Sequence, residues 1–80
     1  GLRGLIMFQR GQKIECIYNK EVNVCLEKGK EYIVLEHTSP DKCVGELANH
    51  PAEWVKNGGR VEVDQFPGCY WYGRRFKTVA

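Results

Sequence analysis

Residues 31–36 read Glu-Tyr-Ile-Val-Leu-Glu, and this stretch decides the fold class. Its aromatic and β-branched side chains favour a β-strand, because such side chains pack well on a pleated surface. Residues 28–30 (Lys-Gly-Lys) form a turn before it, and residues 38–41 (Thr-Ser-Pro-Asp) form a turn after it. The sequence therefore predicts a well-bounded strand here.

Short strand patterns recur on both sides of this stretch. They lie at residues 13–18, 60–64, 69–72 and 77–79. Residues 60–64 alternate cleanly between polar and apolar, as the half-buried strands of a sheet do. Residues 43–47 are suited to pair back on the central strand as its hairpin partner. Five short strands with turns between them predict an all-β fold, either a small barrel or a sandwich.

The length and composition narrow the class of protein. Eighty residues allow one small domain and exclude large catalytic architectures. A net charge of +2 is too mild to indicate a nucleic-acid-binding protein by itself. Because Met7 is the only methionine, we expect residues 1–6 to be a tag remnant or a disordered N-terminus and residues 7–80 to form one domain. The alternative is that the first residues form a strand.

A helix signal interrupts the strand patterns. Pro51 suits the first position of a helix, Glu53 its first turn and Lys56 its last turn, and Gly58 follows. The sequence therefore predicts a short inserted helix over Pro51–Asn57, with a structureless loop as the alternative. Such a short helix needs tertiary support, and Trp54 is the side chain expected to anchor it.

The order of these signals resembles that of many small phage and prophage proteins. The matching blocks are residues 7–17, with Cys-Ile closing a short strand, residues 26–34, with a Gly-Lys turn before Tyr-x-Val, and residues 61–76, with an aromatic before Arg-Phe. The resemblance implies a five-stranded Src-homology-3-like (SH3-like) barrel over residues 7–80, acting in the cytoplasm of a bacterial host. Residues 37–59 do not match. The Ala-Leu-Tyr stretch and Trp pair of a proline-rich-peptide groove are absent, so that activity is not implied.

Four cysteines suggest three alternative states. They are Cys16, Cys25, Cys43 and Cys69. No two stand at the close spacing typical of a zinc site, and three lie in stretches that resemble strands. We therefore expect reduced thiols, with disulfides or a structural zinc bound by all four as the alternatives. His37 and His50 are expected in exposed loops.

Aromatic and basic residues gather near the C-terminal end of the sequence. Residues 70–77 hold three consecutive aromatics, then Arg74, Arg75, Phe76 and Lys77. On a strand, Tyr70 and Tyr72 face one way and the residue between them faces the other, so part of this cluster belongs to the core. The candidate binding residues are Tyr18, Trp54, Arg60, Trp71, Tyr72, Arg74, Arg75 and Lys77.

No catalytic constellation is recognisable in the sequence. There is no Gly-rich phosphate loop, and the carboxylates alternate with apolar residues as on a solvated sheet face. We therefore expect a non-enzymatic module without a cofactor, which binds a host or phage protein as a monomer or weak dimer and does not insert into a membrane. The alternatives are a nucleic-acid-binding barrel that uses the aromatic and basic surface, and a zinc-stabilised structural module.

Overall fold

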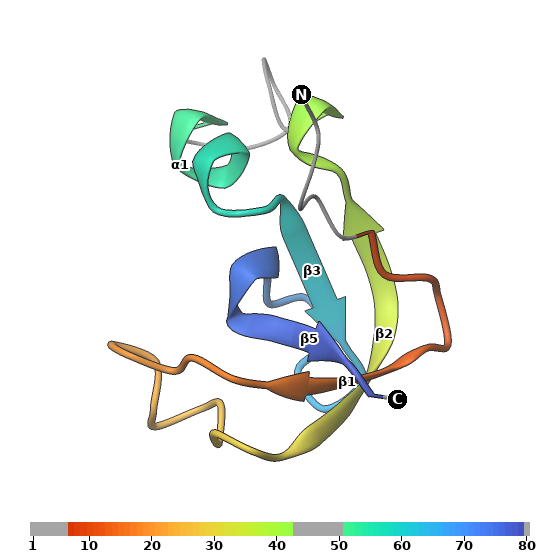
Figure 1. Cartoon of the computed structure of the whole chain (residues 1–80), viewed down its shortest axis with the longest axis vertical. Helices are drawn as coiled ribbons and strands as arrows, with labels where there is room; N and C mark the ends of the chain where they lie inside the picture. The colour runs from red at the N-terminus through yellow and green to blue at the C-terminus, as the bar shows by residue number, and fades with distance from the viewer. Residues whose placement is uncertain (1–6, 43–50, 80) are drawn as a thin grey trace.

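A computed structural model describes residues 7–42 and 51–79 (Figure 1). Its elements are the strands β1 (Lys13–Cys16), β2 (Glu31–Thr38), β3 (Arg60–Val63), β4 (Trp71–Tyr72) and β5 (Phe76–Thr78), the helix α1 (Pro51–Lys56), and the 3₁₀ helices η1 (Pro40–Lys42) and η3 (Gly73–Arg75). The predicted all-β class, the single small domain and the short inserted helix are confirmed. The predicted hairpin partner at residues 43–47 lies outside the described residues, as do Cys43 and His50.

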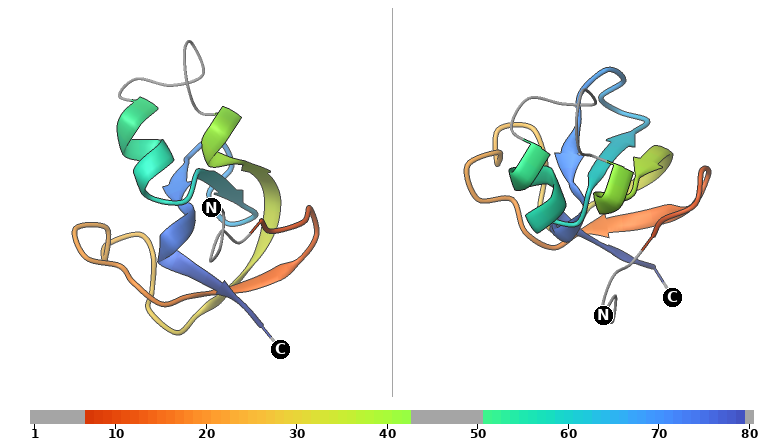
Figure 2. Two further views of the ribbon diagram at one scale, coloured as in Figure 1. Left: turned by 45° about the horizontal axis from the view of Figure 1, so that its top comes forward. Right: turned by 90° about the horizontal axis from the view of Figure 1, so that it is seen from above.

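The strands form one antiparallel sheet in the order β4-β3-β2-β1-β5. The long strand β2 pairs with β1 near its start and with β3 near its end, and the register shifts between Val34 and Glu36. A register shift of this kind bends a strand. The curved β2 therefore joins the β1–β5 part of the sheet to the β3–β4 part, while α1 lies beside η1 at one end (Figure 2).

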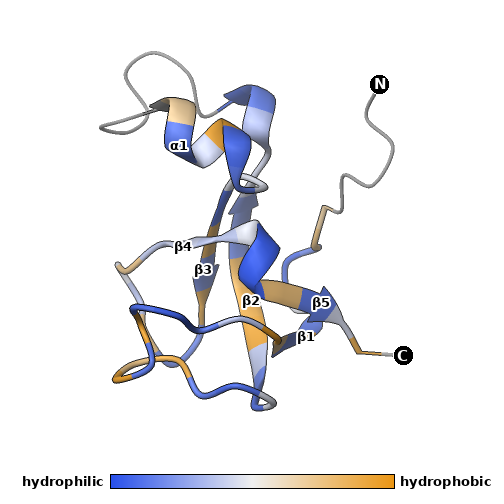
Figure 3. Cartoon of the chain, turned by 60° about the vertical axis from the view of Figure 1, so that its left-hand side comes forward, coloured by the Kyte–Doolittle hydropathy of each residue, from blue (hydrophilic) through white to orange (hydrophobic). Residues whose placement is uncertain are grey.

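The core lies inside this bent sheet. Its buried members are Phe8, Ile14, Cys16, Leu26, Tyr32, Val34, Val61, Val63 and Phe76. Three strands contribute alternate residues, because successive side chains of a strand point to opposite faces. Figure 3 shows the resulting hydrophobic stretches along β2 and β3. Each fully buried aliphatic or aromatic side chain stabilises the fold by about 1.5–3 kcal/mol relative to exposure.

Each strand differs from its predicted bounds by one or more residues, and hydrogen bonds account for the differences in β1 and β4. Strand β1 ends at Cys16 rather than residue 18, because the N–H groups of Ile17 and Tyr18 both donate to the carbonyl of Arg75 (2.7 and 3.3 Å). Strand β4 is shorter than residues 69–72, because the N–H of Cys69 closes a turn on the carbonyl of Phe66 (3.1 Å). A long-range contact thus ends β1, whereas a local turn delays the start of β4.

The prediction that His37 lies in an exposed loop was wrong. Strand β2 continues to Thr38, so His37 is a half-buried strand residue and not part of an exposed loop. Its ring stacks on Phe8 with centroids 5.2 Å apart. Its Nδ1 accepts from the N–H of Phe8 (3.0 Å), and its Nε2 is 2.9 Å from the Gly58 carbonyl. With Nε2 as the donor, the neutral ring joins the N-terminal segment to the loop after α1.

Candidate binding site

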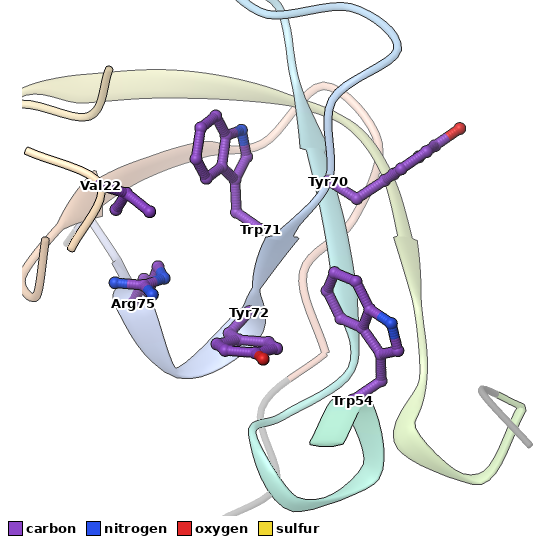
Figure 4. Close-up of a pocket in the computed structure, with 6 residues that line it drawn as sticks. All are labelled: Val22, Trp54, Tyr70, Trp71, Tyr72 and Arg75. Carbon is purple, nitrogen blue, oxygen red and sulfur yellow. The ribbon is translucent and has the colours of Figure 1, made fainter. Parts of the chain in front are cut away.

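A groove lined mostly by aromatic side chains lies beside strand β4 (Figure 4). Its cavity volume is about 230 Å³. The lining residues are Val22, Trp54, Tyr70, Trp71, Tyr72 and Arg75. They come from the β1–β2 loop, α1, β4 with the residue before it, and η3. Four of the six side chains are aromatic, and we refer to this site as the aromatic groove.

Alternation along the chain sets the direction of the three consecutive aromatic side chains. Tyr70 and Trp71 point away from one another in Figure 4. Trp71 packs against the core, edge-to-face with Phe66 (centroids 5.7 Å apart), and its buried Nε1 has no hydrogen-bond acceptor among the described residues. The ring of Tyr72 instead meets Trp54 edge-to-face, with centroids 5.0 Å apart. Trp71 therefore forms a wall continuous with the core, and the Trp54–Tyr72 pair forms a partly exposed wall.

Backbone contacts hold α1 against the β4–η3 segment. The side-chain amide of Asn57 donates to the Glu53 carbonyl (2.7 Å), which ends the helix. The next contacts join the two segments, because Gly73 donates to the Gly59 carbonyl (3.1 Å) and Arg74 to the Asn57 carbonyl (3.0 Å). These bonds supply the tertiary support that a six-residue helix requires. They also bring Trp54 to Tyr72.

Arg75 is the buried charge of the groove. Its residue is only 5% exposed, and its Nη1 donates to the carbonyls of Lys20 (3.0 Å) and Tyr18 (3.4 Å). Its guanidinium carbon lies 5.4 Å from the ring centroids of both Tyr18 and Tyr72. Arg75 therefore links the β1–β2 loop to β4 and places a positive charge beside the aromatic side chains.

Two further arginines lie over tyrosine rings around the groove. The guanidinium carbon of Arg74 is 4.5 Å from the centroid of Tyr18, and that of Arg60 is 4.1 Å from the centroid of Tyr70. Lys77 is exposed on β5, in register with Glu15, and does not line the groove. Of the candidate residues, the structure thus brings together seven around the groove and leaves Lys77 apart.

The candidates taken from the sequence left out two lining residues, Val22 and Tyr70. Val22 was not a candidate, because a lone valine in a loop carries no local signal of a binding role. It reaches the groove through a turn in which its N–H donates to the Asn19 carbonyl (3.1 Å) and its own carbonyl accepts from Leu26 (2.9 Å). Tyr70 belonged to the recognised cluster but not to the candidates, and it also lines the groove.

The described cysteines occupy different environments. Cys16 is buried in the core, and this burial raises the pKa of its thiol. Cys25 and Cys69 are exposed free thiols. Within residues 7–42 and 51–79, no three His, Cys, Asp or Glu side chains are arranged to hold a metal ion. A zinc site that uses all four cysteines does not fit this arrangement.

No protein-family model matches this chain, and no similar protein was found among curated proteins or solved structures. No helix in the described part of the chain has the length and apolar character needed to span a membrane. The fold and the groove therefore define the class of protein as a small all-β domain with an aromatic surface groove beside a buried arginine.

Proposed function

We propose that this protein is a non-enzymatic interaction module that binds an exposed segment of a protein partner in the aromatic groove. The observation that carries the proposal is the partly exposed Trp54–Tyr72 pair beside the walls formed by Trp71 and Val22. Tryptophan, tyrosine and arginine are the residues that most often dominate binding energy at protein interfaces. A cavity of about 230 Å³ suits one or two side chains of a partner rather than a large cofactor.

We further propose that the domain is an SH3-like barrel of the kind found in small phage and prophage proteins, with a host or phage protein as its partner in the bacterial cytoplasm. Three features support the barrel. The strand order is β4-β3-β2-β1-β5, the curved β2 belongs to both parts of the sheet, and a 3₁₀ turn links β4 to β5. A weak dimer or a monomer is compatible with β4 as an edge strand.

Single-stranded nucleic acid is the second candidate partner, because three arginines lie among aromatic rings. Bases bind such surfaces by stacking on the faces of aromatic rings. The faces of Tyr18 and Tyr70 are already occupied by Arg74 and Arg60, and Trp54 meets Tyr72 edge-to-face. These contacts cover part of the ring surface on which a base would stack, so a peptide segment is the favoured ligand.

The first test is selection of short random peptides on the immobilised wild-type protein, followed by titration of the selected peptides in solution. Both tryptophans of the chain line the groove, so their emission should report directly on its occupation. We expect the double variant Trp54→Ala/Tyr72→Ala to bind at least about tenfold more weakly, since interface aromatics often contribute about 2 kcal/mol or more.

The matched control is Val55→Ala. Val55 is an exposed neighbour of Trp54 on α1 and does not line the groove, so its replacement should leave the affinity unchanged. Circular dichroism checks that each variant remains folded. Equal affinity of the wild type and the folded double variant would contradict the proposal. Tighter binding of labelled single-stranded DNA, weakening steeply with salt, would favour nucleic acid instead.

A further inference from the structure

Arg75 carries a positive charge that no described acidic side chain neutralises. Its residue is 5% exposed, and the ion pair found within residues 7–42 and 51–79 joins Lys13 to Glu31 instead. Glu21 follows Lys20 in the same loop but is exposed and forms no ion pair with Arg75. A buried charge without an oppositely charged partner destabilises the folded state, because the charge loses its hydration and the low-dielectric interior solvates it less well than water does.

The contacts of Arg75 orient its guanidinium without cancelling its charge. Both described hydrogen bonds are donated by Nη1, to the carbonyls of Tyr18 and Lys20. The rings of Tyr18 and Tyr72 add only the attraction of their π faces. A guanidinium has five N–H donors in a planar fork, and this fork matches a carboxylate in a bidentate geometry. The position of Arg75 in the lining of the groove therefore favours an anionic group on the ligand.

We propose that the groove binds an acidic segment of its protein partner, with an Asp or Glu carboxylate against the guanidinium of Arg75. This inference rests on the proposed function and adds the chemistry of the ligand to it. The aliphatic or aromatic neighbour of that acidic residue packs against the partly exposed surface of the Trp54–Tyr72 pair. Arg74 and Arg60 lie around the groove and favour approach of a negatively charged segment.

The test compares four synthetic peptide pools with blocked ends and randomised flanks. The central residue is fixed as Glu, Gln, Lys or Leu, so that the Glu and Gln pools differ only in the charge of one group. Each pool is titrated into the wild-type protein with tryptophan emission as the readout. We expect the Glu pool to bind about tenfold more tightly than the Gln pool, and the Lys pool to bind most weakly.

A second measurement follows Arg75 itself. In the ¹⁵N-labelled wild-type protein, the Nε–Hε resonance of Arg75 should shift on addition of the Glu pool and much less with the Gln pool. Arg75→Lys keeps the charge but loses the planar fork, so the preference for Glu over Gln should fall. Lys77→Gln removes an exposed cation outside the groove and should leave that preference unchanged. If Arg75→Lys fails to fold, two measurements on the wild-type protein still test the carboxylate contact. They are the affinities of the Glu and Gln pools and the shift of the Arg75 Nε–Hε resonance.

The outcomes separate this inference from the proposed function. Equal binding of the Glu and Gln pools would overturn the carboxylate contact while leaving peptide binding intact. Binding of no pool would overturn both. The last outcome is that a labelled single-stranded oligonucleotide displaces the Glu pool and binds more tightly. The anionic group that Arg75 binds would then be a nucleic-acid phosphate, and the acidic-peptide inference would be wrong.

Discussion

At the scale of single residues, His37 and Arg75 are polar groups whose roles arise from burial. His37 bonds through both ring nitrogens to backbone groups of Phe8 and Gly58. Burial lowers the pKa of its imidazole, although the hydrogen bond to the Gly58 carbonyl acts in the opposite direction. Protonation of Nδ1 would remove the acceptor for the N–H of Phe8. The neutral ring is therefore the form that fits the fold.

This histidine makes stability depend on pH. Its folded-state pKa lies below the unfolded value of about 6.5, so the unfolded state binds more protons in the interval between them. The contribution of neutral His37 to the free energy of unfolding is fully present above about pH 6.5. It is lost as the pH falls from there through the folded-state pKa of the imidazole. We expect urea unfolding to show the stability advantage of wild type over His37→Gln shrinking below about pH 6.5. An advantage that is constant or grows on acidification would contradict this account.

At the scale of elements, close backbone packing between the α1–β3 loop and η3 forms the groove. Gly73 lies so near this loop that a Cβ atom there would be 2.2 Å from the carbonyl oxygen of Gly58. The backbone must move to accept any side chain at this position. The segment that would move carries Tyr72 before Gly73 and Arg75 after it.

We expect Gly73→Ala to destabilise the protein by about 1–3 kcal/mol and to weaken peptide binding in the groove. Denaturant unfolding measures the first effect and tryptophan-emission titration the second. Gly68→Ala is the control, because Gly68 has a φ of +84° but no atom within 4 Å of the added Cβ. It should cost some stability through the backbone alone and leave peptide affinity unchanged. Wild-type affinity in Gly73→Ala would show that this close contact does not position the groove.

At the scale of the whole molecule, one core connects both parts of the bent sheet. Cys16 of β1 packs with buried residues from β2, β3 and β5, and the structure exposes none of its surface. Burial also raises the pKa of its thiol, which leaves less of the reactive thiolate at neutral pH. Its reactivity therefore depends on opening of the core.

We expect a thiol reagent to modify Cys25 and Cys69 rapidly in the folded protein, whereas Cys16 is modified only as the chain unfolds. Peptide mapping by mass spectrometry after timed labelling distinguishes these sites. Addition of urea should accelerate the labelling of Cys16 far more than that of Cys25. Equal rates for Cys16 and Cys25 under native conditions would show that the core opens locally.

The sequence by itself determined the class of the fold. Alternation within residues 60–64 and the aromatic and β-branched composition of residues 31–36 are local properties, and they predicted two strands that the structure contains. The helix signals around Pro51 likewise predicted α1. The expected alternation also placed part of the aromatic cluster in the core, and Trp71 does pack against the core and points away from Tyr70.

Only the tertiary structure decided which residues form the groove. Val22 and Trp54 meet β4 and η3 there although they are distant in sequence, and the burial of Arg75 follows from carbonyl groups in the β1–β2 loop. The burial of His37 likewise depends on Phe8 and Gly58. The physical reason is that periodicity reports which face of a strand is apolar, whereas depth and charge pairing depend on non-local segments that pack against that face.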